Sequence, residues 1–173
     1  MLRPGLLAGA GITLSGALPS AVGVRLRQLG AGEGTDALVH GAAPPRDADG
    51  VRAALDEAWD AILAAGLPPG PRLIILLAPP PGDAHHAAAR AGLENLARTL
   101  SIEWAQHGIR PVAVLQGGDD EATAELVAYL ASPAGAYFSG CAITLRPPTG
   151  PRPSPPSASP APPRTPPAPS PSG

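Results

Sequence analysis

The five residues Leu73-Ile-Ile-Leu-Leu77 form the clearest strand in this sequence, apolar throughout and followed by three prolines at positions 79–81. An apolar run without polar alternation is typical of a strand that is covered on both faces, as strands of parallel sheets usually are. The run therefore predicts a parallel sheet with helices on both sides.

Strand-like and helix-like segments alternate on either side of this run. Four further short apolar segments predict strands, at 6–14, 36–40, 112–115 and 138–145. Apolar residues at helical spacing predict four helices, at 18–29, 50–65, 84–107 and 121–132. Asp47 or Asp49 can cap the second of these helices, and Asp83 the third. The alternating order predicts an α/β fold, a three-layer Rossmann-like arrangement around a mostly parallel sheet of about five strands.

The composition limits the classes of function. The chain has 173 residues, a formal net charge of -2 and a hydrophobic fraction of 44%. This charge provides no excess of positive groups to bind nucleic acid or an anionic membrane, and no apolar run is long enough to cross a bilayer. The single cysteine, Cys141, predicts a reducing cytoplasm. The apolar stretch that follows Arg3 and runs to Leu18 allows a signal peptide as the alternative, although Gly9, Gly11 and Gly16 interrupt it.

The chain divides into one folded domain and a tail. Residues 147–173 hold 13 of the 25 prolines, with serine, alanine and little else between them. Such a segment has almost no apolar side chains to bury and lacks many backbone donors. We therefore expect a domain over 1–146 and a disordered, proline-rich tail over 147–173, which is either passive or a ligand for an aromatic groove.

Two stretches resemble a known family. Ala91-Gly-Leu-Glu-Asn-Leu-Ala-Arg-Thr-Leu-Ser-Ile-Glu-Trp-Ala-Gln-His-Gly-Ile-Arg110 is similar to the long active-site helix of the short-chain dehydrogenases/reductases. Glu125-Leu-Val-Ala-Tyr-Leu-Ala-Ser-Pro133, with the following Tyr137-Phe-Ser-Gly140 and Ile143, resembles the family's closing helix and last strand. The nearest branch is the 3-oxoacyl carrier-protein reductases. The resemblance implies a Rossmann-like fold that lacks two of the usual βα units, because only Gly32–Thr35 separates the first helix from the second strand.

The positions that carry catalysis in the family differ here. The family's tyrosine, the general acid or base, corresponds to His86, and its lysine, which holds the nicotinamide ribose, corresponds to Arg90. The catalytic serine would fall near Leu77-Ala78-Pro79, where no residue has a hydroxyl group. The sequence has no lysine, and its one asparagine, Asn95, lies outside the position of the family's catalytic asparagine.

The residues implied for the cofactor, NAD(P) if any binds, lie at three strand ends. They are Ser15, Gly16, His40, Gly41, Gln116 and Gly117. The family's glycine-rich turn lets the backbone approach the pyrophosphate at a helix terminus. Here only Gly16 matches that turn, because Ser20 and Val22 replace its later glycines.

Three functions remain open on the sequence alone. The first is a homologue without the usual catalytic set that acts through interaction, as a homodimer or a heteromer with a paralogue. The resemblance implies contact through the helices at 50–65 and 84–107, along Leu93, Leu96 and Leu100 or their neighbours on the opposite face. The second is an NAD(P)-dependent oxidoreductase that uses His86 and Arg90 in altered roles. The third is a decayed gene or a wrongly assigned reading frame. The four histidines do not show metal-ligand spacing, so we expect no metal site.

Overall fold

The computed structural model describes residues 2–66 and 72–146. Five strands form one sheet in chain order, and all four neighbouring pairs are parallel. The strands are β1 (Gly11–Gly16), β2 (Gly32–Gly41), β3 (Leu73–Ala78), β4 (Arg110–Leu115) and β5 (Cys141–Thr144). The helices between them are α1 (Ser20–Gln28), α2 (Ala48–Ala65), α3 (Ala84–Glu103) and α4 (Asp120–Ala131), with short 3-10 turns at Ala105–His107 and Pro133–Tyr137. The predicted α/β fold is confirmed.

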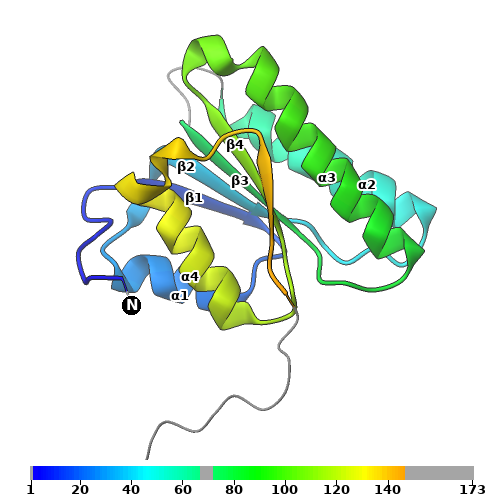
Figure 1. Cartoon of the computed structure of the whole chain (residues 1–173), viewed down its shortest axis with the longest axis horizontal. Helices are drawn as coiled ribbons and strands as arrows, with labels where there is room; N and C mark the ends of the chain where they lie inside the picture. The colour runs from blue at the N-terminus through cyan, green and yellow to red at the C-terminus, as the bar shows by residue number, and fades with distance from the viewer. Residues whose placement is uncertain (1, 67–71, 147–173) are drawn as a thin grey trace, which may run out of the picture.

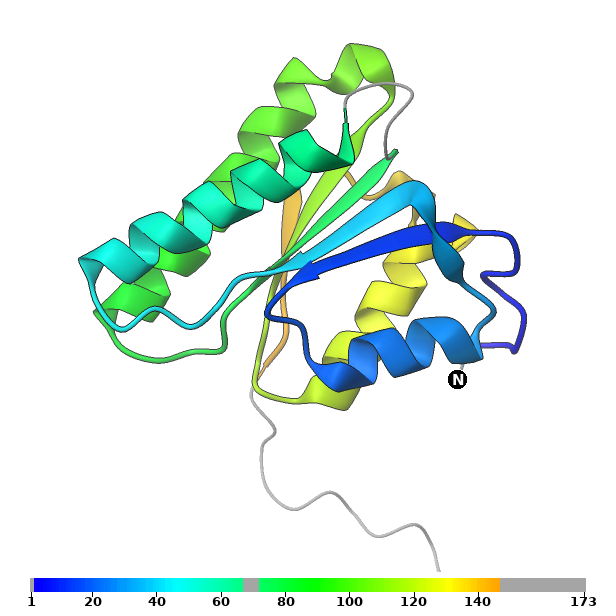
Figure 2. The same cartoon turned by 180° about the vertical axis from the view of Figure 1, so that it is seen from behind.

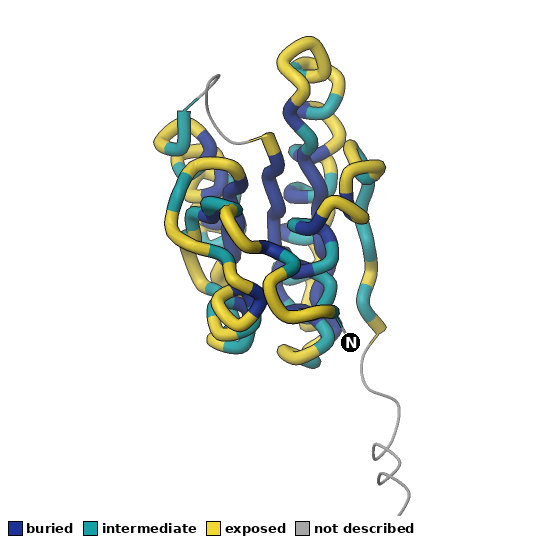
Figure 3. The backbone as a smooth tube through the Cα atoms, turned by 90° about the vertical axis from the view of Figure 1, so that its left-hand side faces the viewer, coloured by how far each residue is buried: buried dark blue, intermediate teal, exposed yellow. Residues whose placement is uncertain are grey.

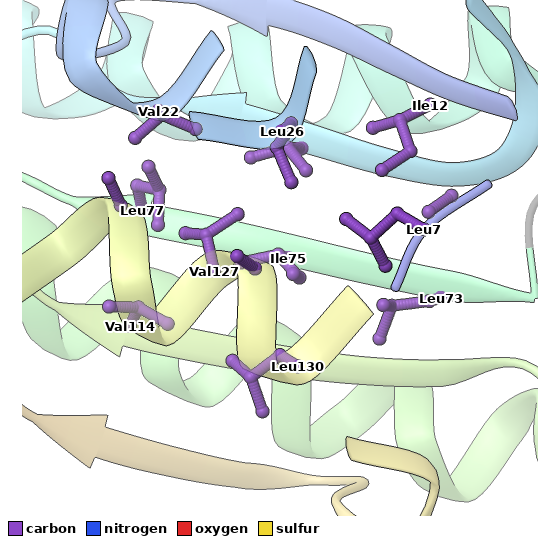
Figure 4. Packing of buried hydrophobic residues seen from close by; sticks show 14 of the residues in the cluster. Leu7, Ile12, Val22, Leu26, Leu73, Ile75, Leu77, Val114, Val127 and Leu130 are labelled. Atoms are coloured by element: carbon purple, nitrogen blue, oxygen red, sulfur yellow. The ribbon is translucent and has the colours of Figure 1, made fainter. Parts of the chain in front are cut away.

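Helices cover both faces of the sheet (Figures 1 and 2): α2 and α3 lie on one face, and α1 and α4 on the other. Every residue of β3 is buried, as expected for the central strand (Figure 3). Its side chains alternate between two cores. Ile75 and Leu77 pack with α1 and α4, whereas Ile74 and Leu76 pack with α2 and α3. Figure 4 shows the first core, to which α1 contributes Val22 and Leu26 and α4 contributes Val127 and Leu130.

The connections between strands differ in hand. Each strand pairs with the next one in the chain, so every crossover steps in the same direction across the sheet. The crossovers through α1 and α4 pass over one face and those through α2 and α3 over the other, so the two pairs have opposite hands. Right-handed crossovers account for about 98% of parallel connections. One pair in this fold is therefore of the rare left-handed kind.

Aspartates begin three of the helices. The side chain of Asp47 accepts a hydrogen bond from the backbone N–H of Gly50 at 2.7 Å, so Asp47, and not Asp49, caps α2. Asp83 caps α3 through the N–H groups of His85 and His86, as predicted. Asp119 caps α4 in the same way. Each cap satisfies helix N–H groups that have no partner within the helix.

Several predicted boundaries were wrong. The first strand begins at Gly11, because residues 4–9 form successive turns in which Gly5 and Gly9 have positive φ. The third helix ends at Glu103, and the 3-10 turn follows it to His107. The last strand begins only at Cys141, since the preceding residues form the second 3-10 turn and a short extended link.

The predicted seam for self-association needs a correction. Leu93 and Leu100 are fully buried in the core between α3 and the sheet, so neither side chain is available to a partner. Leu96 is only partly buried, and it lies beside Leu55 and Trp59 of α2. Any contact through these helices therefore uses Leu96 and its neighbours on the outer face.

Within residues 2–66 and 72–146, no helix is long and apolar enough to cross a membrane. The same residues contain no group of three metal-ligating side chains. The predicted tail over 147–173 lies outside the described residues.

Candidate functional site

The carboxyl ends of the strands meet at one edge of the sheet, where ligands of open α/β sheets bind. The register places Ser15 beside His40 and Gly16 beside Gly41. At the same edge, Gly41 of β2 pairs with Leu77 of β3, and Ala78 of β3 pairs with Leu115 of β4. All six residues predicted for cofactor binding therefore lie along this edge, with Gln116 and Gly117 directly after β4. Arg90 of α3 reaches the same edge.

The turn after β1 packs directly on the end of β2. The N–H of Ala17 donates to the carbonyl oxygen of Gly41 at 2.6 Å. A Cβ atom on Gly41 would lie 2.2 Å from the carbonyl oxygen of Ala17, so the turn after β1 rests directly on β2. Gly16 has a φ of 73°, and a Cβ there would meet the ring of His40 at 2.7 Å. Both positions require glycine, and their packing brings the two strand ends into direct contact.

His40 is a buried histidine with one partner. Its Nδ1 lies 3.2 Å from Ser15 Oγ, and its Nε2 has no hydrogen-bond partner among the described residues. Desolvation lowers the pKa of His40, while the negative charge of Glu57 on α2 partly opposes this shift. The imidazole is therefore neutral at pH 7.

The side chain of Arg90 binds backbone carbonyl oxygens of two other residues. Its Nη1 donates to the carbonyl oxygens of Pro79 at 2.5 Å and of Gln116 at 2.8 Å. These carbonyls follow the ends of β3 and β4, so one guanidinium ties two neighbouring strand ends to α3. Desolvation lowers the pKa of Arg90, but an arginine remains charged in proteins. These two bonds use the N–H groups of Nη1, so Nε and Nη2 remain as donors for another acceptor.

His86 pairs with the residue that caps its helix. Its Nδ1 lies 2.9 Å from Asp83 Oδ1, and because a carboxylate only accepts, Nδ1 carries the proton. Hydrogen bonds from the side chain and then the backbone of His86 hold the pKa of Asp83 well below its ordinary value. With the proton on Nδ1, Nε2 of the partly exposed His86 ring is the nitrogen that can accept a proton.

The end of β4 is also covered by the chain. A Cβ atom on Gly117 would lie 2.5 Å from the carbonyl oxygen of Arg146, so the segment after β5 passes directly over this turn. The N–H of Leu145 bonds to the carbonyl oxygen of Leu115 at 3.0 Å. The Gln116 side chain is buried.

One groove lies at the site, and a second lies away from it. A groove of about 300 Å³ opens beside Arg90, and Leu115 forms part of it together with the start of α3. A slightly larger one, about 350 Å³, lies away from this edge, between β1, α1 and the link to β2. Of the predicted site residues, Arg90 lines the first groove and His86 does not. The second contains none of the predicted site residues.

Sequence reasoning missed three partners in this site. Asp83 was predicted as a cap but not as the partner of His86, although the i, i+3 spacing was a readable signal. Glu57 near His40 and the carbonyl of Pro79 had no such signal, because each lies far along the chain from the residue it acts on.

Comparisons with solved structures identify the fold. The chain is similar to a citronellol catabolism dehydrogenase of Pseudomonas aeruginosa PAO1, with a TM-score of 0.64, 21% identity, and coverage of 84% of this chain and 97% of that one. It is also similar to the NADH-dependent enoyl-[acyl-carrier-protein] reductase of Aquifex aeolicus VF5, with a TM-score of 0.66, 14% identity, and coverage of 80% and 95%.

A third similar structure is an oxidoreductase of the short-chain dehydrogenase/reductase family from Burkholderia thailandensis, with a TM-score of 0.60, 16% identity, and coverage of 80% and 92%. A scan against protein-family models and a search of curated proteins gave no match. The chain therefore has the fold of the short-chain dehydrogenases/reductases, as the sequence resemblance implied.

Proposed function

We propose that this chain is a non-catalytic homologue of the short-chain dehydrogenases/reductases that acts in the reducing cytoplasm by binding a second copy of itself or a related chain. One observation carries the proposal: the guanidinium of Arg90, at the position of the family's lysine, is bound by the carbonyls of Pro79 and Gln116.

The neighbouring positions support the same conclusion. The end of β3 reads Leu77-Ala78-Pro79, so no hydroxyl group is present where the family's serine would lie. The turn after β1, where the family binds the pyrophosphate, packs on the end of β2 through the bond of Ala17 to Gly41. A dinucleotide would have to displace this packing and would not find the usual donors.

The outer face of α2 and α3 is the surface we assign to association. Trp59 and Leu63 are 39% and 49% exposed and lie one turn apart on α2, so they form an apolar strip on its outer face. Beside Trp59, a shallow groove of about 320 Å³ runs between the helices, with Leu55 and Leu96 in its walls. Trp59 also stacks against Trp104, with ring centroids 6.3 Å apart. An apolar strip of this kind suits the matching strip of a second copy.

The test is the mass of the purified chain in solution, by light scattering or sedimentation. We expect a dimer, and Trp59→Arg should shift it to monomer, because the charge cannot be desolvated in an apolar interface. Tyr137→Arg is the matched control, since Tyr137 is 94% exposed on the 3-10 turn after α4. A wild-type chain that is monomeric at all accessible concentrations would rule out self-association.

An altered oxidoreductase is the second candidate, and the Asp83–His86 pair favours it. A carboxylate that holds Nδ1 of a histidine fixes the tautomer and orients Nε2 for proton transfer. In this alternative Arg90 would bind the ribose through Nε or Nη2, the donors that the two carbonyls do not use. Oxidation of NADPH in the presence of carbonyl substrates, lost in His86→Ala, would support it.

A decayed gene, the third possibility, predicts a chain that does not unfold cooperatively.

A further inference from the structure

We infer that a proline-rich motif of the chain's own tail, Pro160-Ala-Pro-Pro-Arg164, docks in the groove between α2 and α3 and competes there with a second copy. This inference rests on the proposed function, because it names a regulator of the surface assigned to association. Grooves lined by aromatic side chains bind proline-rich segments in the polyproline II conformation. The walls of this groove, which holds about 320 Å³, are Leu55, Trp59, Gly92, Asn95, Leu96 and Thr99.

The groove offers both apolar contact and unused hydrogen-bonding groups. A Cβ atom on Gly92 would lie 2.8 Å from Leu55 Cδ2, so the two helices touch at the floor of the groove. Asn95 and Thr99 are exposed on its α3 side, and within residues 2–66 and 72–146 neither side chain has a hydrogen-bond partner. Because a polyproline II segment has no internal hydrogen bonds, its carbonyl oxygens can accept from these two side chains.

Acidic side chains lie beside the tryptophan of the groove. Asp56 and Asp60 are one turn apart on α2, and both are exposed. The helical repeat places them on the side of Trp59 opposite Leu55. Neither carboxylate forms an ion pair with any residue that the structure describes. The groove therefore presents an apolar ring next to two unneutralised negative charges.

The tail carries the complementary charge. Its charged side chains are Arg152 and Arg164, and it has no acidic residue. Each arginine directly follows two prolines spaced three residues apart, after Pro148 and Pro151 and again after Pro160 and Pro163. Three residues per turn place the two prolines of such a motif on one edge of a polyproline II helix. Their rings can then lie on the aromatic ring while the arginine pairs with a carboxylate.

Chain length selects the second of these two motifs. Arg146 precedes the tail and lies beside Gly117, at the carboxyl edge of the sheet. α3 begins at this edge, and its rise places Gly92 to Thr99 about 12–22 Å along the helix. The 13 residues 147–159 can span about 40 Å, which is enough to bring Pro160 into the groove. Pro148 is only two residues from Arg146, about 6 Å, and cannot enter it.

Docking of the tail opposes self-association. A tethered motif has an effective concentration in the millimolar range when its linker spans the distance. Each copy must release its tail before Trp59 can pack in the interface, so only the fraction of chains with an open groove can dimerise. Weakening the docked motif should therefore tighten the dimer.

The experiment uses the full-length chain and a tail variant that combines Pro160→Ala, Pro163→Ala and Arg164→Glu. Both tryptophans of the chain lie at the groove, so their fluorescence reports this site. At a concentration where sedimentation shows monomer, acrylamide should quench the tail variant more strongly than the wild type. The dimer dissociation constant of the tail variant should be at least about 10-fold lower.

Two controls separate docking from a general effect of the tail. Pro148→Ala, Pro151→Ala and Arg152→Glu together change the first motif, which is out of reach, and should match the wild type in both measurements. In a background of Asp56→Asn and Asp60→Asn, Arg164→Glu should no longer raise the quenching, because the carboxylates that it pairs with are gone.

Failure of the docking and failure of self-association give different results. If the wild type never dimerises but the tail variant is quenched more strongly, docking stands and self-association falls. Equal quenching of the two monomers would overturn the docking and leave the groove to the second copy alone. Stronger quenching without a tighter dimer would overturn the competition.

Discussion

Replacement of Arg90 separates a structural role from a cofactor-binding role. Arg90→Met keeps the aliphatic stem and removes the donor that joins Pro79 and Gln116, the residues that follow β3 and β4. A hydrogen bond from a charged donor contributes about 1.5–3 kcal/mol when its acceptor is buried. Arg90 is partly exposed, so solvent screening should hold the loss for the two bonds together to about 2 kcal/mol, less than two full-strength bonds would give.

The assay is urea denaturation followed by circular dichroism, with thermal melting as a second measurement. For a domain of this size, 2 kcal/mol corresponds to a drop of about 4–8 °C in Tm. Arg98→Met is the matched control, since Arg98 pairs only with Glu94 on the exposed side of the same helix. Its loss should stay below about 0.5 kcal/mol.

Arg90→Lys makes the contrast sharper. A lysine restores the residue type of the active family but replaces a fork of donors with one ammonium group. If the role of Arg90 is only to join the ends of β3 and β4, a role we call the clamp, Arg90→Lys loses stability and gains no affinity for NADPH. Unchanged stability in Arg90→Met, or dinucleotide binding gained by Arg90→Lys, would refute the clamp.

Three other predictions follow from the fold. Because burial lowers the pKa of His40, the unfolded chain binds its proton more readily, so stability should fall as the pH drops below about 6.5 and hold above it, with less of this dependence in His40→Gln. Leu77→Ala in the centre of the sheet should cost about 2–5 kcal/mol, whereas Ile102→Ala, at a side chain 79% exposed, should change stability by less than about 0.5 kcal/mol. Asp47→Ala should cost about 1 kcal/mol, measured by the same denaturation, through loss of the cap on Gly50.

The sequence was informative where a local pattern determines the structure. The apolar run at 73–77 predicted a strand covered on both faces, and β3 is buried at every position. The aspartates before the helices predicted caps, and Asp47 and Asp83 are caps. Periodicity showed which side of each helix is apolar. It did not show which face of the sheet each helix covers, so the opposite hands of the crossovers through α1 and α2 were not predictable.

The same limit applies to the site. The alternating order placed Ser15, His40 and Gln116 at strand ends, and the register brings the first two together. The partners of Arg90 were not predictable, because they are backbone carbonyls, which every residue carries, at separations of 11 and 26 residues. The start of β1 was misplaced because Leu6 and Leu7 are apolar like a strand, whereas Gly5 and Gly9 turn the backbone.

Titration of the purified full chain with NADPH and NADH, followed by calorimetry, tests the central claim most directly. The packing of Ala17 against Gly41 and the bonds of Arg90 predict no saturable heat up to about 1 mM of either dinucleotide, from a chain that melts cooperatively. Saturable binding of either dinucleotide below about 1 mM would contradict the claim that this chain keeps the fold of its relatives without their cofactor site.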